Sequence, residues 1–317
     1  MGKLINIFMF VVTILIVSGC SKHGEIENNK IKIDNGGRVL SFEYNPKRLV
    51  TLRQHITETA LEIELDPYIV GCSSVIDPPV PDHLKSRYDK LPIIAEKYPT
   101  IERLLDVNPD IIWVDRKWAF VKNQLGSMKN IEKQGIKVYL SESGFHSTND
   151  IKYVYDDLSR MGYLFNKQDR ADILINEMKG KIKNINNIVK DIDKKVKVLD
   201  YDSSRGNLAF VGCRCMADNL IHLAGGENIF SDINKEWANV NWEEIIKRNP
   251  DVIIVHEYRG ISGLSKIEEL RRNPLLQDVN AVKNNRFIIV NLDEIYEGVR
   301  NADTVEKLAK GFYPERF

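Results

Sequence analysis

Basic and aromatic side chains follow several of the short apolar segments that have the composition of buried strands. Guanidinium groups bind carboxylate, catecholate or hydroxamate oxygens, and aromatic rings cover the apolar faces of a ligand. Because ligands of open parallel sheets bind beyond the carboxyl ends of the strands, we expect a cleft for a bulky, partly anionic small molecule. The candidate cleft residues are Arg53, His55, Arg116, Trp118, Tyr201, Arg205, Tyr258, Arg259, Tyr296 and Arg300.

Two histidines at the predicted strand ends offer a second chemistry, the direct binding of a metal ion. His55 stands near Glu58, and His256 is followed by Glu257. Neutral imidazole and carboxylate groups are suitable ligands for a transition metal. The six histidines of the chain are scattered, however, and we expect neither a metal site nor a cofactor.

Three cysteines of the chain body, Cys72, Cys213 and Cys215, belong to no clear motif. An exported protein permits disulfides, but three thiols cannot all pair, and a bridge between Cys213 and Cys215 would close a tight, strained ring. A zinc site would need a second pair of ligands at a suitable spacing. We expect small buried or free thiols, with a disulfide and a zinc site as open alternatives.

The N-terminus has the layout of a secretory signal peptide, in which a basic residue precedes an uncharged apolar run over residues 4–17. The run ends in Val-Ser-Gly-Cys, which resembles the bacterial lipobox, whose cysteine is lipidated and becomes the first residue. We expect a signal peptide over residues 1–19, acyl chains such as palmitate on Cys20, and a polar tether over residues 20–35. An uncleaved anchor helix is the alternative. The mature protein is therefore expected on the extracytoplasmic face of the cell membrane.

Short β-rich segments alternate with amphipathic helical stretches along the rest of the chain. Segments such as Asp-Ile-Ile-Trp-Val and Asp-Val-Ile-Ile-Val are apolar after their first residue, which is typical of strands covered on both faces. This alternation predicts an α/β fold with parallel sheets and helical crossovers. The predicted strands cover residues 48–52, 68–73, 110–114 and 137–140 in the first half, and residues 196–201, 251–255 and 286–290 in the second.

A long helix is predicted between the two halves, over residues 168–193. Its apolar residues recur every three or four positions and form one stripe. At 1.5 Å per residue this helix would span on the order of 35 to 40 Å, enough to bridge two lobes. We therefore predict two Rossmann-like lobes with parallel sheets, residues 36–167 and 194–317, joined by the helix. An ordinary crossover helix inside one sheet is the alternative.

An internal repeat supports two similar lobes. Residues 102–114 align without gaps with residues 243–255, at a constant offset of 141, and six of thirteen positions are identical. In each copy a helix should end at Asn-Pro, because proline cannot continue it, and a buried strand follows. A capping residue, Thr or Asn, stands two positions before each copy. Glu102 and Glu243 therefore fall in equivalent first turns.

With the lipobox, the two Glu-x6-Pro-Asp units and the bridging helix, the chain resembles the class III, helical-backbone substrate-binding proteins of ABC importers over roughly residues 36–317. The resemblance implies that a ligand binds between the lobes and that the long helix limits their closure. It also implies that one glutamate of each lobe pairs with arginines of the two permease subunits. By position these glutamates are Glu102 and Glu243. The alternative is that each glutamate merely favours the positive end of its helix.

The resemblance also implies the class of ligand, since such proteins carry ferric siderophores, cobalamin or haem. The basic and aromatic candidates favour a ferric siderophore. Cobalamin would favour a less charged aromatic cleft, and haem would favour an axial Tyr or His, for which Tyr258, Tyr296 and His256 are candidates. The expected partners are this small metal chelate, a permease dimer and the lipid bilayer, and the protein itself is expected to be a monomer.

Composition and missing motifs exclude other classes of protein. The 317-residue chain has 45 basic and 45 acidic residues, and this balance argues against nucleic acid as the main partner. The apolar segment at the N-terminus is the one long enough to meet a membrane, which excludes an integral transporter. The body contains no GxSxG, HExxH or P-loop motif, so an exported hydrolase is not expected. The sequence predicts a binding protein rather than an enzyme.

Overall fold

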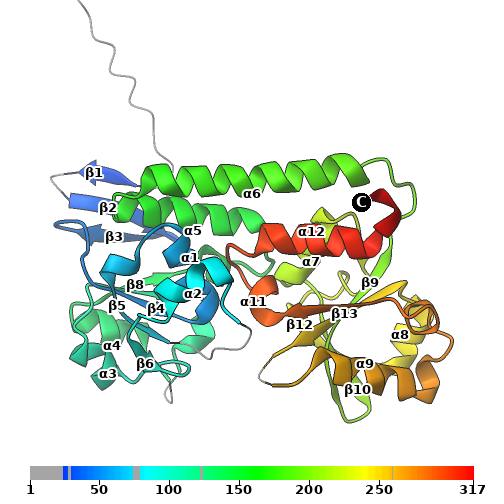
Figure 1. Ribbon diagram of the computed structural model, residues 1–317. Coiled ribbons are helices and arrows are strands. Elements are labelled where there is room, and N and C mark those ends of the chain that lie inside the picture. The colour runs from blue at the N-terminus through cyan, green and yellow to red at the C-terminus, as the bar shows by residue number, and fades with distance from the viewer. Residues whose placement is uncertain (1–23, 28–29, 74–78, 122–123, 259) are drawn as a thin grey trace, which may run out of the picture.

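The computed structural model describes residues 24–27, 30–73, 79–121, 124–258 and 260–317. Two α/β lobes lie side by side below a long helix, α6 (Gln168–Val189), which runs along both of them (Figure 1). The expected signal peptide and Cys20 lie outside the described residues. Within the described part of the chain, no helix is long and apolar enough to cross a bilayer.

The N-terminal lobe is built on a parallel sheet with the strand order β6-β5-β4-β7-β8. Every residue of β4 and β7 is buried, as expected for strands covered on both faces. The sheet comprises β4 (Leu49–Leu52), β5 (Ile69–Ser73), β6 (Ile93–Ala95), β7 (Ile111–Val114) and β8 (Lys137–Leu140). The helices of this lobe are α1 (Gln54–Glu62), α2 (Asp82–Tyr88), α3 (Ile101–Asp106), α4 (Met128–Lys133) and α5 (Ile151–Leu164).

A small antiparallel sheet precedes this lobe and corrects the expected extent of the flexible tether. It consists of β1 (Glu25–Glu27), β2 (Lys30–Asn35) and β3 (Arg38–Phe42). Residues 30–35 were expected in the tether, but their alternating sequence Lys-Ile-Lys-Ile-Asp-Asn suits a strand with one buried face. The Asn35 side chain ties β2 to the lobe, because it donates to the Leu140 carbonyl at 2.7 Å and accepts from the Leu140 amide at 3.1 Å.

The C-terminal lobe has a mixed sheet, whereas the sequence predicted a parallel one. Its strand order is β12-β10-β9-β13-β14, and β10 runs antiparallel to both of its neighbours. The strands are β9 (Lys197–Arg205), β10 (Leu208–Gly212), β11 (Glu227–Asn228), β12 (Trp237–Asn241), β13 (Val252–Glu257) and β14 (Phe287–Asn291). The cause is the two-residue turn between β9 and β10, in which Gly206 has φ of 63°, because so short a connection permits only antiparallel pairing.

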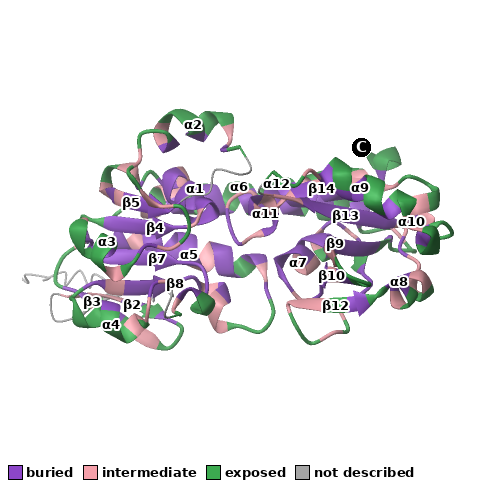
Figure 2. Cartoon of the chain, turned by 90° about the horizontal axis from the view of Figure 1, so that it is seen from below, coloured by how far each residue is buried: buried purple, intermediate pink, exposed green. Residues whose placement is uncertain are grey.

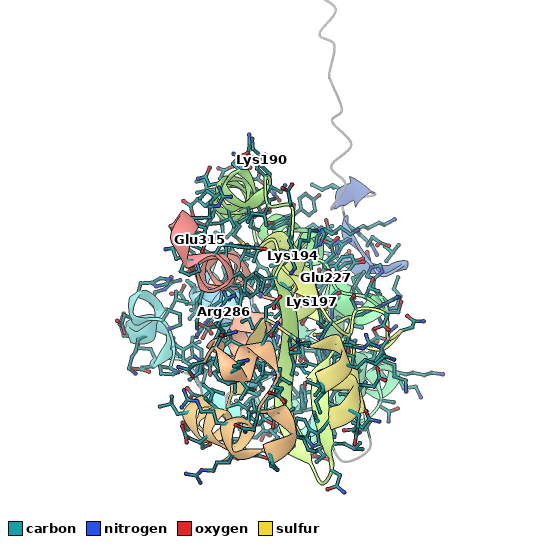
Figure 3. The ribbon with its side chains drawn as sticks, turned by 90° about the vertical axis from the view of Figure 1, so that its right-hand side faces the viewer. Lys190, Lys194, Lys197, Glu227, Arg286 and Glu315 are labelled. Carbon is teal, nitrogen blue, oxygen red and sulfur yellow. The ribbon has the colours of Figure 1, made fainter. Side chains whose placement is uncertain are left out.

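The helices of the C-terminal lobe lie around this sheet, and the last of them returns to α6 (Figure 1). They are α7 (Met216–Leu223), α8 (Trp242–Arg248), α9 (Gly263–Arg272), α10 (Asn280–Lys283), α11 (Leu292–Ile295) and α12 (Asn301–Phe312). At the outer end of the lobe the Arg286 guanidinium donates to the carbonyls of Gly311 and Phe312 (Figure 3). This arginine satisfies carbonyl groups that the end of α12 leaves without helical partners.

The internal repeat forms the same local structure in both lobes, as predicted. The Thr100 hydroxyl accepts from a backbone amide at the start of α3, and the Asn241 side chain does so at the start of α8. Each helix is followed by an asparagine with a positive φ, 41° at Asn108 and 47° at Asn249. Asparagine tolerates this left-handed conformation, and the next residue, proline, ends the helix. A buried strand follows in each copy.

The apolar stripe of α6 packs into a hydrophobic core that draws residues from both lobes. The helix ends at Val189, four residues before the predicted end. Asp191 and Asp193 explain the difference, since carboxylates are unfavourable near the negative end of a helix dipole. The central strands of both sheets and the inner helix faces are buried (Figure 2). The core also holds buried, free thiols, namely Cys72, Cys213 and Cys215.

Candidate functional site

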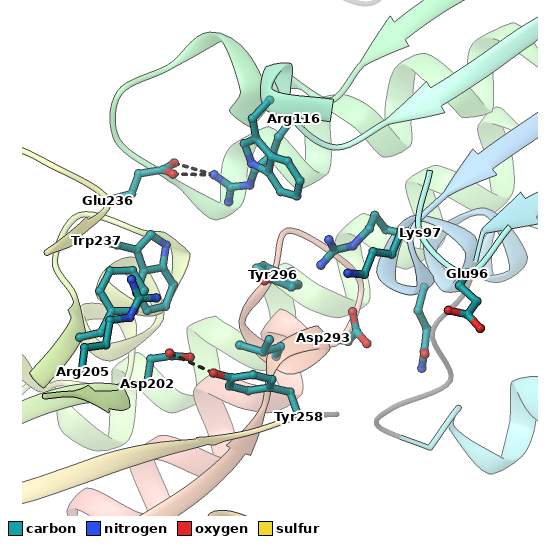
Figure 4. A pocket seen from close by; sticks show the side chains of 15 residues that line it. Glu96, Lys97, Arg116, Asp202, Arg205, Glu236, Trp237, Tyr258, Asp293 and Tyr296 are labelled. Carbon is teal, nitrogen blue, oxygen red and sulfur yellow. Dashed lines mark hydrogen bonds and ion pairs between the residues drawn. The ribbon is translucent and has the colours of Figure 1, made fainter. Parts of the chain in front are cut away.

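A cleft of about 390 Å³ lies between the two lobes, and both of them line it (Figure 4). Its size falls within the range of small-molecule sites. The lining residues of the N-terminal lobe are Arg53, Gln54, Glu96, Lys97, Arg116 and Trp118. Those of the C-terminal lobe are Asp202, Arg205, Phe210, Glu236, Trp237, Tyr258, Leu292, Asp293 and Tyr296.

The cleft contains six of the ten residues predicted to line it. Five of the six end a strand or follow one, as expected if ligands bind beyond the carboxyl ends of strands. The sixth, Tyr296, lies in the segment after α11. The six residues are Arg53, Arg116, Trp118, Arg205, Tyr258 and Tyr296.

Two of the other predictions were wrong, because these side chains have partners elsewhere. Tyr201 is fully buried in the core of the C-terminal lobe and donates or accepts a hydrogen bond with the Ser204 hydroxyl at 2.7 Å. Side chains alternate across a strand, so the cleft receives its neighbour Asp202 instead. Arg300 forms a two-pronged ion pair with Glu58, at 2.7 and 2.5 Å. That pair joins the lobes at α1 and the start of α12, away from the cleft lining.

The two candidate histidines are not brought together. His55 is buried at the start of α1, where its Nδ1 lies 3.4 Å from Asp293 and its ring contacts Tyr296. His256 is fully buried within β13, 2.5 Å from Asp200. Among the described residues no group of three His, Cys, Asp or Glu side chains could hold a metal ion. Arg259 lies outside the described residues.

Arg53 is the best-supported cation of the N-terminal wall. Its backbone has φ of 96°, a conformation rare for residues other than glycine, and its amide donates to the Ser73 hydroxyl at 3.0 Å. The guanidinium lies 5.8 Å from the ring centre of Trp118 and 5.1 Å from that of Tyr296. Such cation–π contacts orient the group without neutralising its charge. The residue therefore presents a fixed positive charge in the cleft.

The C-terminal wall has a second aromatic-supported cation. Arg205 stacks on Phe210 with its guanidinium carbon 3.6 Å from the ring centre, and Trp237 also stacks on Phe210, with the two ring centres 5.5 Å apart. Phe210 and Trp237 come from β10 and β12, the antiparallel strands of this lobe. Within the described part of the chain neither Arg53 nor Arg205 has a carboxylate at ion-pair distance. Both are available to anionic groups of a ligand.

Arg116 has a different role, because it already bridges the lobes. Its guanidinium lies 2.7 Å from Glu236 and 2.6 Å from Glu297, both of the C-terminal lobe. Burial alone lowers the pKa of Arg116, but the two carboxylates outweigh it and raise that pKa above its ordinary value. The cation is therefore engaged in holding the lobes together across the cleft (Figure 4).

Several lining residues were not predicted from the sequence. Glu96 and Lys97 come from the loop after β6, where the short strand gave no clear signal. Asp202 could have been found from its alternation with Tyr201 in β9. Glu236 and Trp237 depend on the pairing of β12 with β10, a long-range contact without a local signal.

Glu102 and Glu243 do not line the cleft. Both are exposed in the first turns of α3 and α8, which lie on opposite outer sides of the molecule when it is viewed from below (Figure 2). A backbone hydrogen bond and the Thr100 hydroxyl hold the pKa of Glu102 below its usual value. Each glutamate therefore offers a negative charge to solvent, one on each lobe.

Comparisons with known proteins place the chain among extracytoplasmic binding proteins. An uncharacterized ABC transporter substrate-binding lipoprotein of Bacillus subtilis, YvrC, is 21% identical, with 96% of this chain and 95% of the relative covered. The high-affinity heme uptake system protein IsdE of Staphylococcus aureus is 23% identical, with 92% and 90% covered.

Solved structures with the same fold cover both lobes. A periplasmic binding protein from Veillonella parvula superposes with a TM-score of 0.80, 28% identity and coverage of 89% of this chain and 97% of that one. The ABC-type Fe3+-hydroxamate transport system from Saccharomonospora viridis superposes with a TM-score of 0.75, 18% identity and coverage of 89% and 98%.

The match to a family model assigns the chain to the family that its fold and its cleft suggest. The model for periplasmic binding proteins matches residues 49–293, which include most of both lobes and the helix between them. The resemblance to class III binding proteins is thereby confirmed, and the chain is a binding protein rather than an enzyme. The protein belongs to the periplasmic binding protein family and is the substrate-binding component of an ABC importer.

Proposed function

We propose that the protein captures a ferric siderophore in the cleft between its lobes and delivers it to the permease. The observation that carries this proposal is the pair of guanidinium groups, Arg53 and Arg205, each supported by aromatic rings and free of a carboxylate partner among the described residues. Guanidinium groups bind the anionic oxygens of a chelate, and the rings cover its apolar parts. The name of the Saccharomonospora neighbour, which mentions Fe3+-hydroxamate, is consistent with this ligand class.

Haem is a second candidate, because the staphylococcal relative is named a heme uptake protein. The cleft supports it less well. None of the described lining residues is His, Met or Cys. Tyr258 donates its phenol proton to Asp202 at 3.1 Å, and burial followed by this carboxylate raises the pKa of Tyr258 to about 12. Burial also raises the pKa of Tyr296. Both phenols are therefore protonated at neutral pH and would have to release their protons to ligate iron as phenolates.

The proposal includes a lipid anchor at Cys20 and docking through Glu102 and Glu243. The lipobox supports the anchor, and YvrC is named a lipoprotein. The structure provides two exposed carboxylates on separate lobes, and such a pair could match two basic sites on a permease dimer. Two fixed charges of this kind favour correct orientation and rapid encounter more than tight binding.

The test is a ligand titration of the purified mature protein with a ferric trihydroxamate, a ferric tricatecholate, cobalamin and haem. Trp118 and Trp237 line the cleft, so quenching of tryptophan fluorescence should report binding. We expect a ferric chelate to bind with micromolar or lower Kd, which corresponds to about −8 kcal/mol or better. Binding of haem or cobalamin without any ferric chelate would contradict the proposal.

A matched pair of variants localises the site. Arg53→Gln removes the cation between Trp118 and Tyr296 and should weaken chelate binding at least about tenfold, since a charge-assisted hydrogen bond contributes about 1.5 to 3 kcal/mol. Arg103→Gln removes an exposed arginine of α3 outside the cleft and should leave the affinity unchanged. Equal affinities of the two variants would place the ligand elsewhere.

A further inference from the structure

The C-terminal wall of the cleft carries a carboxylate, Asp202, that can accept hydrogen bonds from a ligand. The residue lines the cleft and is 7% exposed (Figure 4). Its Oδ2 accepts hydrogen bonds from the Ser203 hydroxyl at 2.8 Å and from the Tyr258 phenol at 3.1 Å. No arginine or lysine side chain described in the structure forms an ion pair with it. A carboxylate accepts about four hydrogen bonds, so Asp202 keeps acceptor capacity.

A buried histidine behind the wall keeps this carboxylate ionised. His256 lies with Nδ1 3.6 Å from Asp202 and Nε2 2.5 Å from Asp200, and the histidine and Asp200 are fully buried. Burial alone lowers the pKa of His256, but the two carboxylates raise it to about 9. Burial likewise raises the pKa of Asp202, but the charge of His256 and the hydrogen bond from Ser203 outweigh it and lower that pKa. At neutral pH Asp202 can therefore accept hydrogen bonds but not donate them.

The backbone around Asp202 is held in place by a second buried cation. The side chain of Lys266 in α9 donates to the backbone carbonyls of Asp202 and His256, each at 2.6 Å. The strands that carry the two residues, β9 and β13, are paired in parallel. The carboxylate of Asp202 is therefore held in one position, and a ligand must fit that position.

We propose that the ligand carries a protonated amine that donates to Asp202, in addition to the anionic oxygens that Arg53 and Arg205 bind. This inference rests on the proposed function and narrows its ligand class to chelates with both kinds of group. Ser203, Tyr258 and His256 already contact Asp202, but a ligand without a donor would separate its remaining acceptor sites from water without giving them a new partner, which is unfavourable. Asp202 thereby selects against chelates that lack the amine.

The test compares two ferric trihydroxamates that differ at one group. Ferrioxamine B has a terminal ammonium group, and its N-acetyl derivative has the same iron centre without that charge. Calorimetric titration of the full mature protein should show ferrioxamine B binding about tenfold or more tightly than the derivative. Asp202→Asn should abolish this ratio. Glu268→Gln removes an exposed carboxylate of α9 that does not line the cleft and should preserve the ratio.

The outcomes separate this inference from the proposal on which it depends. Equal affinities of the wild-type protein for the two compounds, or tight binding only of ferric chelates without an amine, would overturn the inference and leave the proposed function standing. Failure of every ferric chelate to bind would overturn both. If Asp202→Asn does not fold, as judged by thermal unfolding, the wild-type ratio still decides the question. If Glu268→Gln also abolished the ratio, the effect would be general electrostatics rather than a specific contact with Asp202, and the inference would be wrong.

Discussion

The two lobes contain the same local unit but build different sheets around it. In both, a capped helix is followed by a left-handed asparagine, a proline and a buried strand. The N-terminal sheet is parallel, whereas the C-terminal sheet carries the antiparallel strands β10 and β12 at one edge. These added strands supply Phe210 and Trp237 to the cleft. The repeated unit therefore sets the two-lobe plan, and the added strands decide what one wall presents to a ligand.

The walls also differ in how they hold their charged groups. Aromatic rings support Arg53 in the N-terminal wall, and its guanidinium forms no ion pair with a described carboxylate, although Asp115 and Asp293 act on its charge from a longer distance. In the C-terminal wall, a buried network that includes His256 and Lys266 stabilises Asp202. Because the C-terminal wall also presents Arg205, which Phe210 supports, this wall offers both a cation and a buried carboxylate to one ligand, and the carboxylate depends on side chains behind the wall.

The largest expected effect concerns the exposed glutamates of the repeated unit. We expect Glu102→Arg and Glu243→Arg each to reduce uptake of the ligand at least about tenfold, and the double variant to abolish it, since like charges facing each other at an interface cost several kcal/mol. Uptake is measured with labelled iron in cells that express the cognate permease. Ligand affinity should change less than about twofold, because neither residue lines the cleft.

Glu268→Arg reverses the charge of an exposed residue of α9 and serves as the control, with uptake expected to remain normal. If only one lobe contacts the permease, one of the two single substitutions will account for the whole loss of uptake. A large loss of ligand affinity in either variant would contradict a docking role.

A smaller effect tests whether the two strands of the repeat are equally important for stability. Ile112 and Ile253 occupy equivalent positions of the repeat and are fully buried. Changing either residue to alanine should lower the free energy of unfolding by about 2 to 5 kcal/mol, through lost burial and the cavity left behind. Chemical denaturation measures both losses. Ile173→Ala, at a residue of α6 that is 51% exposed, should change stability by less than about 0.5 kcal/mol.

Similar losses for the two buried variants would show that the added strands do not alter the core around the repeat. If the loss at Ile253 were negligible, the equivalence of the two cores would be wrong.

The smallest effect separates the two left-handed asparagines. Asn108→Gly and Asn249→Gly both place glycine where φ is positive, which glycine tolerates. The Asn249 side chain also accepts a hydrogen bond from the Asn280 amide at 2.8 Å, and no described contact of this kind involves the Asn108 side chain. We therefore expect Asn249→Gly to be less stable than Asn108→Gly by about 1 kcal/mol. Thermal and chemical unfolding measure this difference, and the reverse order would refute it.

Much of the fold could be predicted from sequence because its signals are local. The predicted strands are present with ends shifted by a few residues, and the two N-caps and the Asn-Pro helix ends form as expected. The antiparallel β10 was missed because period-two patterning identifies a strand but not its partner. The extent of the tether was misjudged because a short strand of alternating lysine and isoleucine also reads as polar linker.

The candidate site was predicted less completely for the same reason. The sequence places three arginines at strand ends and thereby predicted them in the cleft, namely Arg53, Arg116 and Arg205. The sequence could not show that Arg116 is already paired with glutamates far away in the chain. Nor could it show that Tyr201 faces the core, because one residue of register moves a side chain to the other face of a sheet.

The sequence by itself determined the elements of this protein, namely two capped helix–strand units, a long amphipathic helix and basic residues at strand ends, because each depends on residues within a few positions of one another. The tertiary structure decided which charges remain available to a ligand. Arg116 is neutralised by residues of the other lobe, whereas Arg53 is not, and Asp202 depends on a histidine of a neighbouring strand. Such pairings join residues distant in the chain, and only the packing of sheets and lobes brings them within ion-pair distance.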